Sequence, residues 1–454
     1  MNQKIHKINY LNPLILGLGN TGISCIEFFC RRNINSNVYD TRVAPPNLNL
    51  IKNYADHCRL QKHITPQILD NTDVVVISPG VVPEDLGFIG EIKQRNIKII
   101  SDIELFATTA MAPIIAVTGT NGKSTVVTLI TKALEQAGKK VLLGGNIGTC
   151  ALELLKQATP DFYVLELSSF QLEFTHNLNA LVGVVLNIEE DHLDRHKTFA
   201  NYQMAKLCLY TQCQYAVINR TMQKTIVELP SVYKSFGLDK ADKENFGLIQ
   251  QNTKTHIAVG DTALLLTSSL KIATSQYIEN ALATLATISF TNIQLAKCFP
   301  AIQEFTGLPH RCQIIQEQHG IKWIDDSKAT NIAAAISALC SIGATCNGKI
   351  ILLAGGLLKN ADCTPLIPHI KKYVSKILLF GEDAKKIYAV LEQKIAHDNI
   401  EIVGNLTKAV SDANNLAKEN DCVLLSPFCA SFDMFKDFAD RGNVFQKAVQ
   451  EVLL

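Results

Sequence analysis

Short aliphatic runs alternate along the whole chain with longer segments in which apolar residues recur every three to four positions. Runs of this length favour buried strands, and the longer segments favour helices that pack on a sheet. The pattern therefore predicts an α/β protein with mainly parallel sheets. At 454 residues the chain is too long for one ordinary hydrophobic core, which indicates several domains.

Two breaks in this pattern divide the chain into three blocks, which we predict to be domains over residues 1–109, 110–307 and 308–454. The first break is ELFATTAMAP, which we interpret as a linker. The second is FPAIQEFTGLPHRC, which holds two prolines and a glycine. The expected strands are PLILGLG, NVYD and DVVVISPG in the first block; IIAVTG, DFYVLEL, LVGVVLN and QYAVIN in the second; and IKWIDD, KIILLAGG, KILLFG and DCVLLSP in the third.

Composition excludes several classes of protein. Lys and Arg number 43 against 42 Asp and Glu, so there is no basic excess of the kind that holds a nucleic acid. The thirteen cysteines include no CxxC pair and mostly fall in apolar segments, so we expect reduced, buried thiols in a cytoplasmic protein. No apolar run approaches the roughly 18 residues that span a bilayer, so we expect no membrane insertion.

The segment IAVTGTNGKSTVVTLI is the first with specific chemistry. Its loop GTNGKST lies between an expected strand and an expected helix, the context in which a Gly-rich loop binds phosphate through backbone N–H groups and the helix N-terminus. Lys123 is expected to meet the outer phosphates, and Ser124 or Thr125 to offer a hydroxyl to a metal ion. The usual phosphate loop has a glycine where this chain has Val117, so the turn is shorter here. A plain Gly-rich turn is the alternative.

Three further residues extend this candidate site. Glu166 ends the apolar run of DFYVLEL, so its strand would deliver a carboxylate to the edge of the sheet where ligands bind, as a Mg2+ ligand. His192 lies in the loop EDHLDRH, whose density of acids and imidazoles favours a metal or phosphate role over a structural one. Lys206 follows on a helix and by itself resembles an ordinary exposed lysine.

A second glycine motif stands in the first block. GLGNTG, residues 17 to 22, follows a strand and precedes a helix, and Asp40 ends the next strand near the spacing of a ribose-binding acid. The motif predicts a pyrophosphate-containing ligand, either a dinucleotide such as NAD or a sugar nucleotide. The turn SPGV, residues 78 to 81, would meet the same ligand.

Several longer motifs occur in an order that resembles the Mur ligase family: GTNGKST, LELSSFQLE, EDHLDRH, AKL, FTGLPHR, DDSKATN and LLSPFCASFDMFKDFADRGNVF. The resemblance spans nearly the whole chain. It implies a Rossmann-like N-terminal domain for a UDP substrate, a central P-loop ATPase domain with a mainly parallel sheet, and a C-terminal Rossmann-like domain that closes on ATP. It also implies an ATP-dependent carbon–nitrogen ligase that uses Mg2+, in two ions, to add D-glutamate to UDP-N-acetylmuramoyl-L-alanine, with no obligate protein partner.

The resemblance also assigns roles to single residues. Those matching the UDP-substrate contacts are Asn20, Thr21, Asp40, Arg42, Gly80 and Asn146. Those matching the ATP and Mg2+ site are Gly119, Thr120, Asn121, Gly122, Lys123, Ser124, Thr125, Glu166, His192, Asn280, Arg311 and Asp326. Lys206 matches a lysine that is carbamylated in the family and then supports a second Mg2+. Lys328 matches the family's SKAT lysine, and the glutamate set is Thr330, Lys359, Ser431 and Phe438.

Two places depart from the family pattern. In AGGLLKNAD, Leu357 and Leu358 replace residues that are usually polar or glycine, which leaves the path of that loop open. In SQYIENALA, Gln276 and Tyr277 stand where histidine and asparagine are frequent, so Asn280 alone of that adenine-side set matches.

Other functions use only part of these features. A folylpolyglutamate synthetase-like ligase would share the second and third blocks, but the GLGNTG block argues against it. A nicotinamide-dependent oxidoreductase would use Gly17 to Gly22 and Asp40 but leaves the phosphate loop unexplained. A non-enzymatic nucleotide-binding scaffold would not need Glu166, His192 and Lys206 together.

Overall fold

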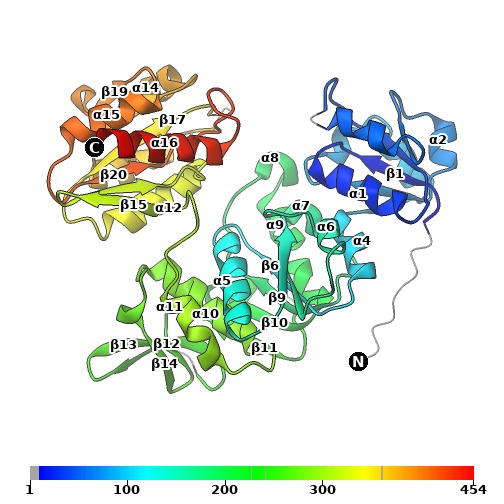
Figure 1. Ribbon diagram of the computed structural model, residues 1–454, viewed down its shortest axis with the longest axis horizontal. Helices are drawn as coiled ribbons and strands as arrows, with labels where there is room; N and C mark the ends of the chain where they lie inside the picture. The colour runs from blue at the N-terminus through cyan, green and yellow to red at the C-terminus, as the bar shows by residue number, and fades with distance from the viewer. Residues whose placement is uncertain (1–9, 46, 226–227, 241, 359–360, 454) are drawn as a thin grey trace. The chain divides into compact units, whose positions relative to one another are not determined.

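The computed structural model describes residues 10–45, 47–225, 228–240, 242–358 and 361–453. The chain divides into two compact units, Met1–Phe305 and Thr306–Leu454. The first unit contains two sheets and the second contains one, and helices pack against each sheet (Figure 1). The predicted α/β class is therefore confirmed.

The first sheet has five parallel strands in the order β3-β2-β1-β4-β5. Ile15 of β1 packs toward Phe29, while Leu14 and Leu16 pack toward Leu69 and the helix on the other face, so the sheet is covered on both sides. Its strands are β1 Pro13–Leu16, β2 Ser36–Tyr39, β3 Cys58–Leu60, β4 Val74–Ile77 and β5 Lys98–Ile100, and its helices are α1 Asn20–Cys30, α2 Pro66–Asp70 and α3 Ile89–Gln94.

The segment expected to be a linker is in fact mostly helical. Helix α4, Asp102–Thr109, is capped by the Ser101 side chain and buries Ile103, Leu105 and Phe106. The small residues and the later proline of this segment predicted a break. The apolar residues inside it are spaced as in a helix, and their burial stabilises the helix instead. The position of the first domain boundary remains a prediction.

The central sheet has nine strands in the order β14-β13-β12-β11-β10-β9-β6-β8-β7. It is parallel from β7 to β12 and antiparallel from β12 to β14. Its strands are β6 Ile114–Thr118, β7 Val141–Gly145, β8 Phe162–Glu166, β9 Ala180–Val185, β10 Cys213–Asn219, β11 Tyr233–Phe236, β12 Phe246–Gln251, β13 Lys254–Val259 and β14 Thr262–Leu266. Its helices are α5 Lys123–Gln136, α6 Ala151–Leu154, α7 Ser169–Leu172, α8 Leu193–His196, α9 Phe199–Leu207, α10 Ser275–Ile288 and α11 Phe299–Gln303.

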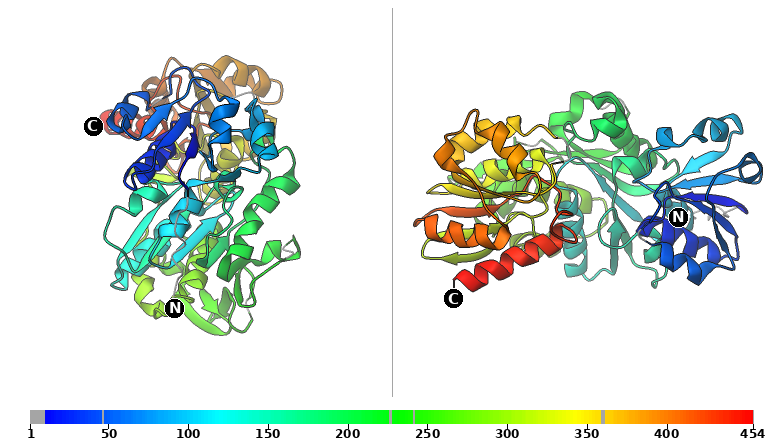
Figure 2. Two further views of the ribbon diagram at one scale, coloured as in Figure 1. Left: turned by 90° about the vertical axis from the view of Figure 1, so that its right-hand side faces the viewer. Right: turned by 90° about the horizontal axis from the view of Figure 1, so that it is seen from above.

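The second unit has a six-stranded sheet in the order β15-β16-β20-β17-β18-β19, parallel except for β15. Helices cover both faces of this sheet (Figure 2). Two separate apolar clusters lie there, one with Leu339 and Ile387 and the other with Val410 and Phe445. Its strands are β15 Gln313–Gln318, β16 Ile321–Asp325, β17 Ile350–Gly355, β18 Val374–Phe380, β19 Ile400–Ile402 and β20 Cys422–Leu425. Its helices are α12 Ile332–Gly343, α13 Ile367–Tyr373, α14 Ala384–Leu391, α15 Leu406–Leu416 and α16 Phe438–Val452.

All eleven strands expected from the sequence are present. The short or edge strands β3, β5, β7, β15 and β19 and the strands β11 to β14 were not expected. All thirteen cysteines lie in described residues and are free thiols, as expected. Six of them are buried and seven are only partly buried, so the expectation of buried thiols holds for only about half of them. Among the described residues, no helix is long and apolar enough to cross a membrane.

Candidate active site

The loop after β6 places several polar groups at the carboxyl edge of the central sheet. Strand β6 ends at Thr118, and α5 begins at Lys123. Gly122, the residue before the helix, has φ +82°, and a Cβ there would lie 2.7 Å from Oδ1 of Asn280. Glycine is therefore required at this turn for both its backbone conformation and the space.

Leu186 and Asn187, which follow β9, lie against this loop, and we call them its floor. Oδ1 of Asn187 accepts from the N–H of Asn121 at 2.8 Å, and its Nδ2 donates to the Asn121 carbonyl at 3.2 Å. The N–H of Thr120 donates to the Asn187 carbonyl at 2.9 Å. The loop is thus held from below by one asparagine that uses both backbone and side chain.

Glu166 lies at the end of β8, where the sequence placed it. The residue is 3% exposed. Oε2 accepts from the Ser124 hydroxyl at 2.6 Å, and Oε1 accepts from Nδ2 of Asn146 at 2.9 Å. A buried carboxylate beside a hydroxyl offers the hard oxygen atoms that Mg2+ prefers.

Two lysines share one carbonyl of the loop. Lys123 Nζ donates to the carbonyls of Gly119 at 2.7 Å and Thr120 at 2.9 Å, and Lys206 Nζ donates to the same Gly119 carbonyl at 3.0 Å. Lys206 is 2% exposed, not a surface lysine. Its burial, and then the nearby Lys123 charge, lower the pKa of Lys206 to about 7. A neutral amine is therefore available near neutral pH.

His192 lies in the same region, but its side chain is half exposed. Its backbone has φ +52°, its Nε2 is 3.6 Å from Oδ2 of Asp191, and its ring lies 5.0 Å from the Phe170 ring. Tyr202 of α9 joins the site as well, since its hydroxyl is 3.0 Å from Oγ1 of Thr120. Thr125 is partly buried in the first turn of α5.

The N-terminal candidates gather at the carboxyl edge of the first sheet. A Cβ at Gly22 would lie 1.9 Å from the Gly17 carbonyl, so α1 can approach β1 only with glycine there. Asn20 is the first residue of α1, Thr21 is the second, and Gly80 is exposed in the turn after β4.

Asp40 is tied to its neighbours. Its Oδ2 accepts from the Leu18 N–H at 2.6 Å, and Arg42 binds both its carboxylate oxygens, at 2.9 and 2.7 Å. Burial acts to raise the pKa of Asp40, but the hydrogen bonds from Arg42 and Leu18 outweigh it and hold that pKa below its usual value. Asp40 therefore fixes the glycine turn and keeps Arg42 at the edge of the site.

Of the residues predicted to lie on the adenine side, helix α10 presents Asn280 and turns Tyr277 away. Asn280 is 9% exposed beside Gly122. Tyr277 is buried, donates from its hydroxyl to the Ile302 carbonyl at 2.5 Å and stacks on Phe305. Tyr277, which stands where the family usually has an asparagine, therefore packs inside the fold.

In the second unit, Asp326 follows β16 and is buried. It accepts from the Ser426 hydroxyl at 2.8 Å and from the Cys312 N–H at 3.2 Å. Burial raises the pKa of Asp326 to about 7, against these hydrogen bonds and the charge of Arg311. Arg311 and Asp326, which the sequence placed together, are neighbours in the fold.

The remaining glutamate-side candidates also lie in this unit. Lys328 Nζ is 5.0 Å from the centre of the Phe438 ring. Ser431 is 2% exposed and Thr330 is exposed. Lys359 lies outside the described residues. Leu357 pairs with Ala430 as an isolated β-bridge and the N–H of Leu358 donates to Asp383, which defines the path of the loop up to Leu358.

Sequence reasoning missed Asn187, Tyr202 and Arg441. Asn187 ends an apolar run just as Glu166 does, so the same signal could have found it. Arg441 is fully buried and donates to the carbonyls of Ser327 and Cys429. Among the described residues, no group of three or more His, Cys, Asp or Glu side chains could hold a metal ion by itself.

Three family descriptions match successive parts of the chain. They are the N-terminal domain of MurD-like Mur ligases over residues 12–101, the Mur ligase middle domain over 117–288, and the Mur ligase glutamate ligase domain over 310–429. Together they cover both units of the structure.

Two solved structures have the same fold. MurF ligase of Thermotoga maritima in complex with ADP matches with a TM-score of 0.60 at 15% identity, over 99% of this chain and 96% of that one. FolC of E. coli in complex with ADP matches with a TM-score of 0.57 at 20% identity, over 77% of this chain and 93% of that one.

Sequence relatives match at higher identity. The UDP-N-acetylmuramoylalanine–D-glutamate ligase of Nitrosococcus oceani is 39% identical over 97% of this chain and 96% of its own length. The ligase of the same name from Pseudomonas aeruginosa is 38% identical over 97% of this chain and 98% of its own length. The chain therefore belongs to the Mur ligase family.

Proposed function

We propose that this protein is the ligase that adds D-glutamate to UDP-N-acetylmuramoyl-L-alanine with ATP, in the synthesis of peptidoglycan precursors in the cytoplasm. The observation that carries the proposal is the full-length similarity at 38–39% identity to ligases named for this reaction. The gathering of Lys123, Ser124, Glu166 and Lys206 at one loop supports it, because the reaction needs those groups.

The reaction must activate a carboxylate, which is a poor electrophile. The γ-phosphoryl group of ATP passes to the alanyl carboxylate and forms an acyl phosphate. The amine of D-glutamate then attacks, and phosphate leaves as the amide forms. Catalysis of this kind relies on positioning and on offsetting negative charge. Lys123, held at the loop by the carbonyls of Gly119 and Thr120, supplies a positive charge for the transferred group.

The donor set fits Mg2+. Ser124 and Glu166 would hold one ion together with phosphate oxygens, and Asn146 fixes the Glu166 carboxylate from its other side. Few protein ligands are expected, since Mg2+ keeps several waters and phosphate oxygens in such sites. The ion would offset charge on the phosphates during transfer.

A second ion needs a change at Lys206. As a protonated ammonium this side chain repels a cation, but its neutral amine can add CO2 and, on releasing a proton to solvent, become an anionic carbamate. The pKa of about 7, which burial and Lys123 produce, makes that neutral form abundant at pH 7 to 8. His192 would lie near such an ion, since its ring and Lys206 Nζ both lie beside the Tyr202 ring.

The substrates are assigned by family position. D-Glutamate is an anion with two carboxylates, which suits a pocket of lysine and hydroxyl groups, and we assign Thr330, Lys359, Ser431 and Phe438 to it. Lys328 is assigned to substrate binding through its match to the SKAT lysine. The UDP moiety is assigned to Asn20, Thr21, Asp40, Arg42 and Gly80. Asn280 is assigned to the adenine of ATP, and Arg311 and Asp326 are assigned to its phosphates and ribose.

One assay tests the proposal. Phosphate release from ATP is measured with UDP-N-acetylmuramoyl-L-alanine and D-glutamate, each omitted in turn, and with L-glutamate, L-lysine and glycine in place of D-glutamate. We expect release only when both substrates are present and only with D-glutamate. Equal rates with the other amino acids would overturn the substrate, and release with a folate and L-glutamate would favour the folylpolyglutamate synthetase-like alternative.

A further inference from the structure

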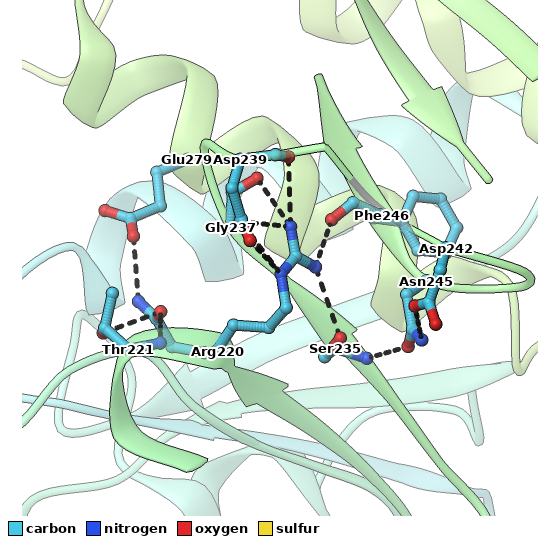
Figure 3. Close-up of polar contacts among 10 residues, drawn as sticks. Arg220, Thr221, Ser235, Gly237, Asp239, Asp242, Asn245, Phe246 and Glu279 are labelled. Carbon is cyan, nitrogen blue, oxygen red and sulfur yellow. Dashed lines mark hydrogen bonds and ion pairs between the residues drawn. The ribbon is translucent and has the colours of Figure 1, made fainter. Parts of the chain in front are cut away.

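Asn219 is a buried amide at the end of β10 whose hydrogen-bonding capacity is fully used. Its Nδ2 donates to the Leu186 carbonyl at 2.9 Å and to Oε1 of Glu279 at 2.8 Å. Its Oδ1 accepts from the N–H and the hydroxyl of Thr221 at 3.0 and 2.9 Å. Two donors and two acceptor positions are all that an amide has. Figure 3 shows Thr221 and Glu279 together on one side of the surrounding polar network.

One end of this bridge is the floor of the phosphate loop. Asn219 donates to the carbonyl of Leu186. The next residue, Asn187, binds the loop residue Asn121. The Leu186 side chain also lies under the loop, because a Cβ built on Gly122 would be 3.3 Å from its Cδ1. Asn219 therefore fixes the position of the Leu186 backbone, and with it the position of the floor beneath the loop.

The other end is the helix that presents Asn280. Glu279 precedes Asn280 in α10, and Oδ1 of Asn280 lies at Gly122. Tyr277 of the same helix is turned toward Ile302 and Gln276 is exposed, so Asn280 is the residue of this set that lies against the loop, at Gly122. The placement of Asn280 matters more in this chain for that reason.

We propose that Asn219 and Glu279 are positioning residues that set Asn280 against the phosphate loop and thereby set the affinity for the adenine nucleotide. This rests on the proposed function in one respect, that ATP occupies the loop. Neither residue needs to touch the nucleotide. The hydrogen bond from Asn219 to Glu279 joins the floor of the loop to the helix, so its loss removes this direct link between them.

The bond needs an acceptor oxygen at position 279, because Nδ2 of Asn219 donates to Oε1 of Glu279. The Glu279 side chain is only partly buried. Burial and the Glu189 charge raise its pKa, while the hydrogen bond from Asn219 acts to lower it. Glutamine keeps an acceptor oxygen in the same place, whereas alanine removes it and leaves a buried N–H of Asn219 without its partner.

The test compares Glu279→Ala with Glu279→Gln in the full-length protein. Binding of ATP with Mg2+ is measured directly by calorimetry, without the other substrates, and steady-state kinetics are measured separately. We expect Glu279→Ala to raise the Kd and the KM for ATP about tenfold, with kcat and the KM for D-glutamate within about twofold of wild type. Glu279→Gln should bind ATP as wild type does.

Asn245→Ala is the matched control. Asn245 is also partly buried and lies at the far side of the same network, where its Oδ1 accepts from the Ser235 N–H at 2.7 Å (Figure 3). Its loss removes a similar hydrogen bond without touching the loop or α10. Thermal unfolding of each variant reports any general loss of stability, and the stabilisation by added ATP gives affinity even in a weakened variant.

The proposal is overturned if Glu279→Ala binds ATP as wild type does, if glutamine and alanine weaken binding equally, or if Asn245→Ala weakens it as much. The calorimetric result does not depend on the acceptor substrate. If the wild-type protein binds ATP but shows no turnover that depends on D-glutamate, the proposed function is refuted, while the effect of Glu279 on ATP binding can still be tested.

Discussion

Lys206 should be largely neutral at a pH where other lysines are charged. It is buried on α9 and lies near Lys123, and these two effects lower its pKa to about 7, while Asp191 and Glu166 act in the opposite direction. Burial is the larger cause, because a charged ammonium loses its hydration in the interior. The neutral form gains ground as pH rises through 7.

The size of the effect follows from this pKa. At a pKa of about 7, about a tenth of Lys206 is neutral at pH 6 and about nine tenths at pH 8. An ordinary lysine with a pKa of about 10.4 is only about 0.4% neutral at pH 8. Lys206 should therefore have roughly a two-hundredfold larger fraction of reactive amine at that pH, which is the property that addition of CO2 requires.

Competitive labelling can measure this fraction. Trace acetic anhydride reacts with neutral amines, and mass spectrometry after digestion gives the rate at each lysine from pH 6 to 10 against an added standard amine. Limited access slows labelling of Lys206 at every pH by the same factor, so it leaves the midpoint unchanged. We expect the rate at Lys206 to rise about tenfold from pH 6 to 8 and then level, while exposed lysines keep rising toward pH 10.

The variant Lys123→Met separates the two causes. Removing the neighbouring charge should move the Lys206 midpoint to higher pH but leave it below that of exposed lysines, because burial remains. A Lys206 rate that rises about tenfold for each pH unit up to pH 10 would refute the reasoning. So would a midpoint that Lys123→Met shifts downward.

Four other changes follow from the structure. Lys123→Ala should lower the rate of phosphate release at least about a hundredfold without lowering the melting temperature, as turnover and thermal unfolding will show. Glu166→Gln keeps the acceptor for Ser124 but removes the charge, so the Mg2+ concentration for half-maximal rate should rise about tenfold or more in a Mg2+ titration. Arg441→Met should destabilise the second unit by about 3 kcal/mol in urea unfolding, because the carbonyls that bind this buried side chain lose their donor. The folded state raises the pKa of Asp326 to about 7 and so binds its proton more tightly; stability of that unit should fall as pH rises from about 4 to 7, and Asp326→Asn should flatten that slope in unfolding measured against pH.

The parts of the site that end strands could be predicted from the sequence. Glu166 follows an apolar run, and a parallel strand delivers its last side chain to the ligand edge of the sheet, as β8 does. The same signal, present at Asn187 and Asn219, was overlooked because an asparagine at a strand end is also common in plain turns.

Other features depend on contacts that no local pattern records. Lys206 is buried because α9 packs its side chain over the Tyr202 ring and onto the Gly119 carbonyl, which lies 87 positions earlier. The short strand β3 has too few residues for an alternation to be recognised, and β13 alternates too little in polarity. Tertiary contacts decide these cases.

The register of the central sheet explains why the turn of the phosphate loop is shorter than in the usual GxxxxGK(S/T) pattern. Val117 pairs with Glu166 on one side and with Val184 on the other, so it belongs to a buried strand and its position cannot start a glycine turn. The turn begins only at Gly119. This register also sets Glu166 level with the end of β6, and α5 starts close enough for Ser124 to reach its carboxylate at 2.6 Å. The valine that departs from the common loop pattern is thus part of what brings the hydroxyl and the carboxylate together.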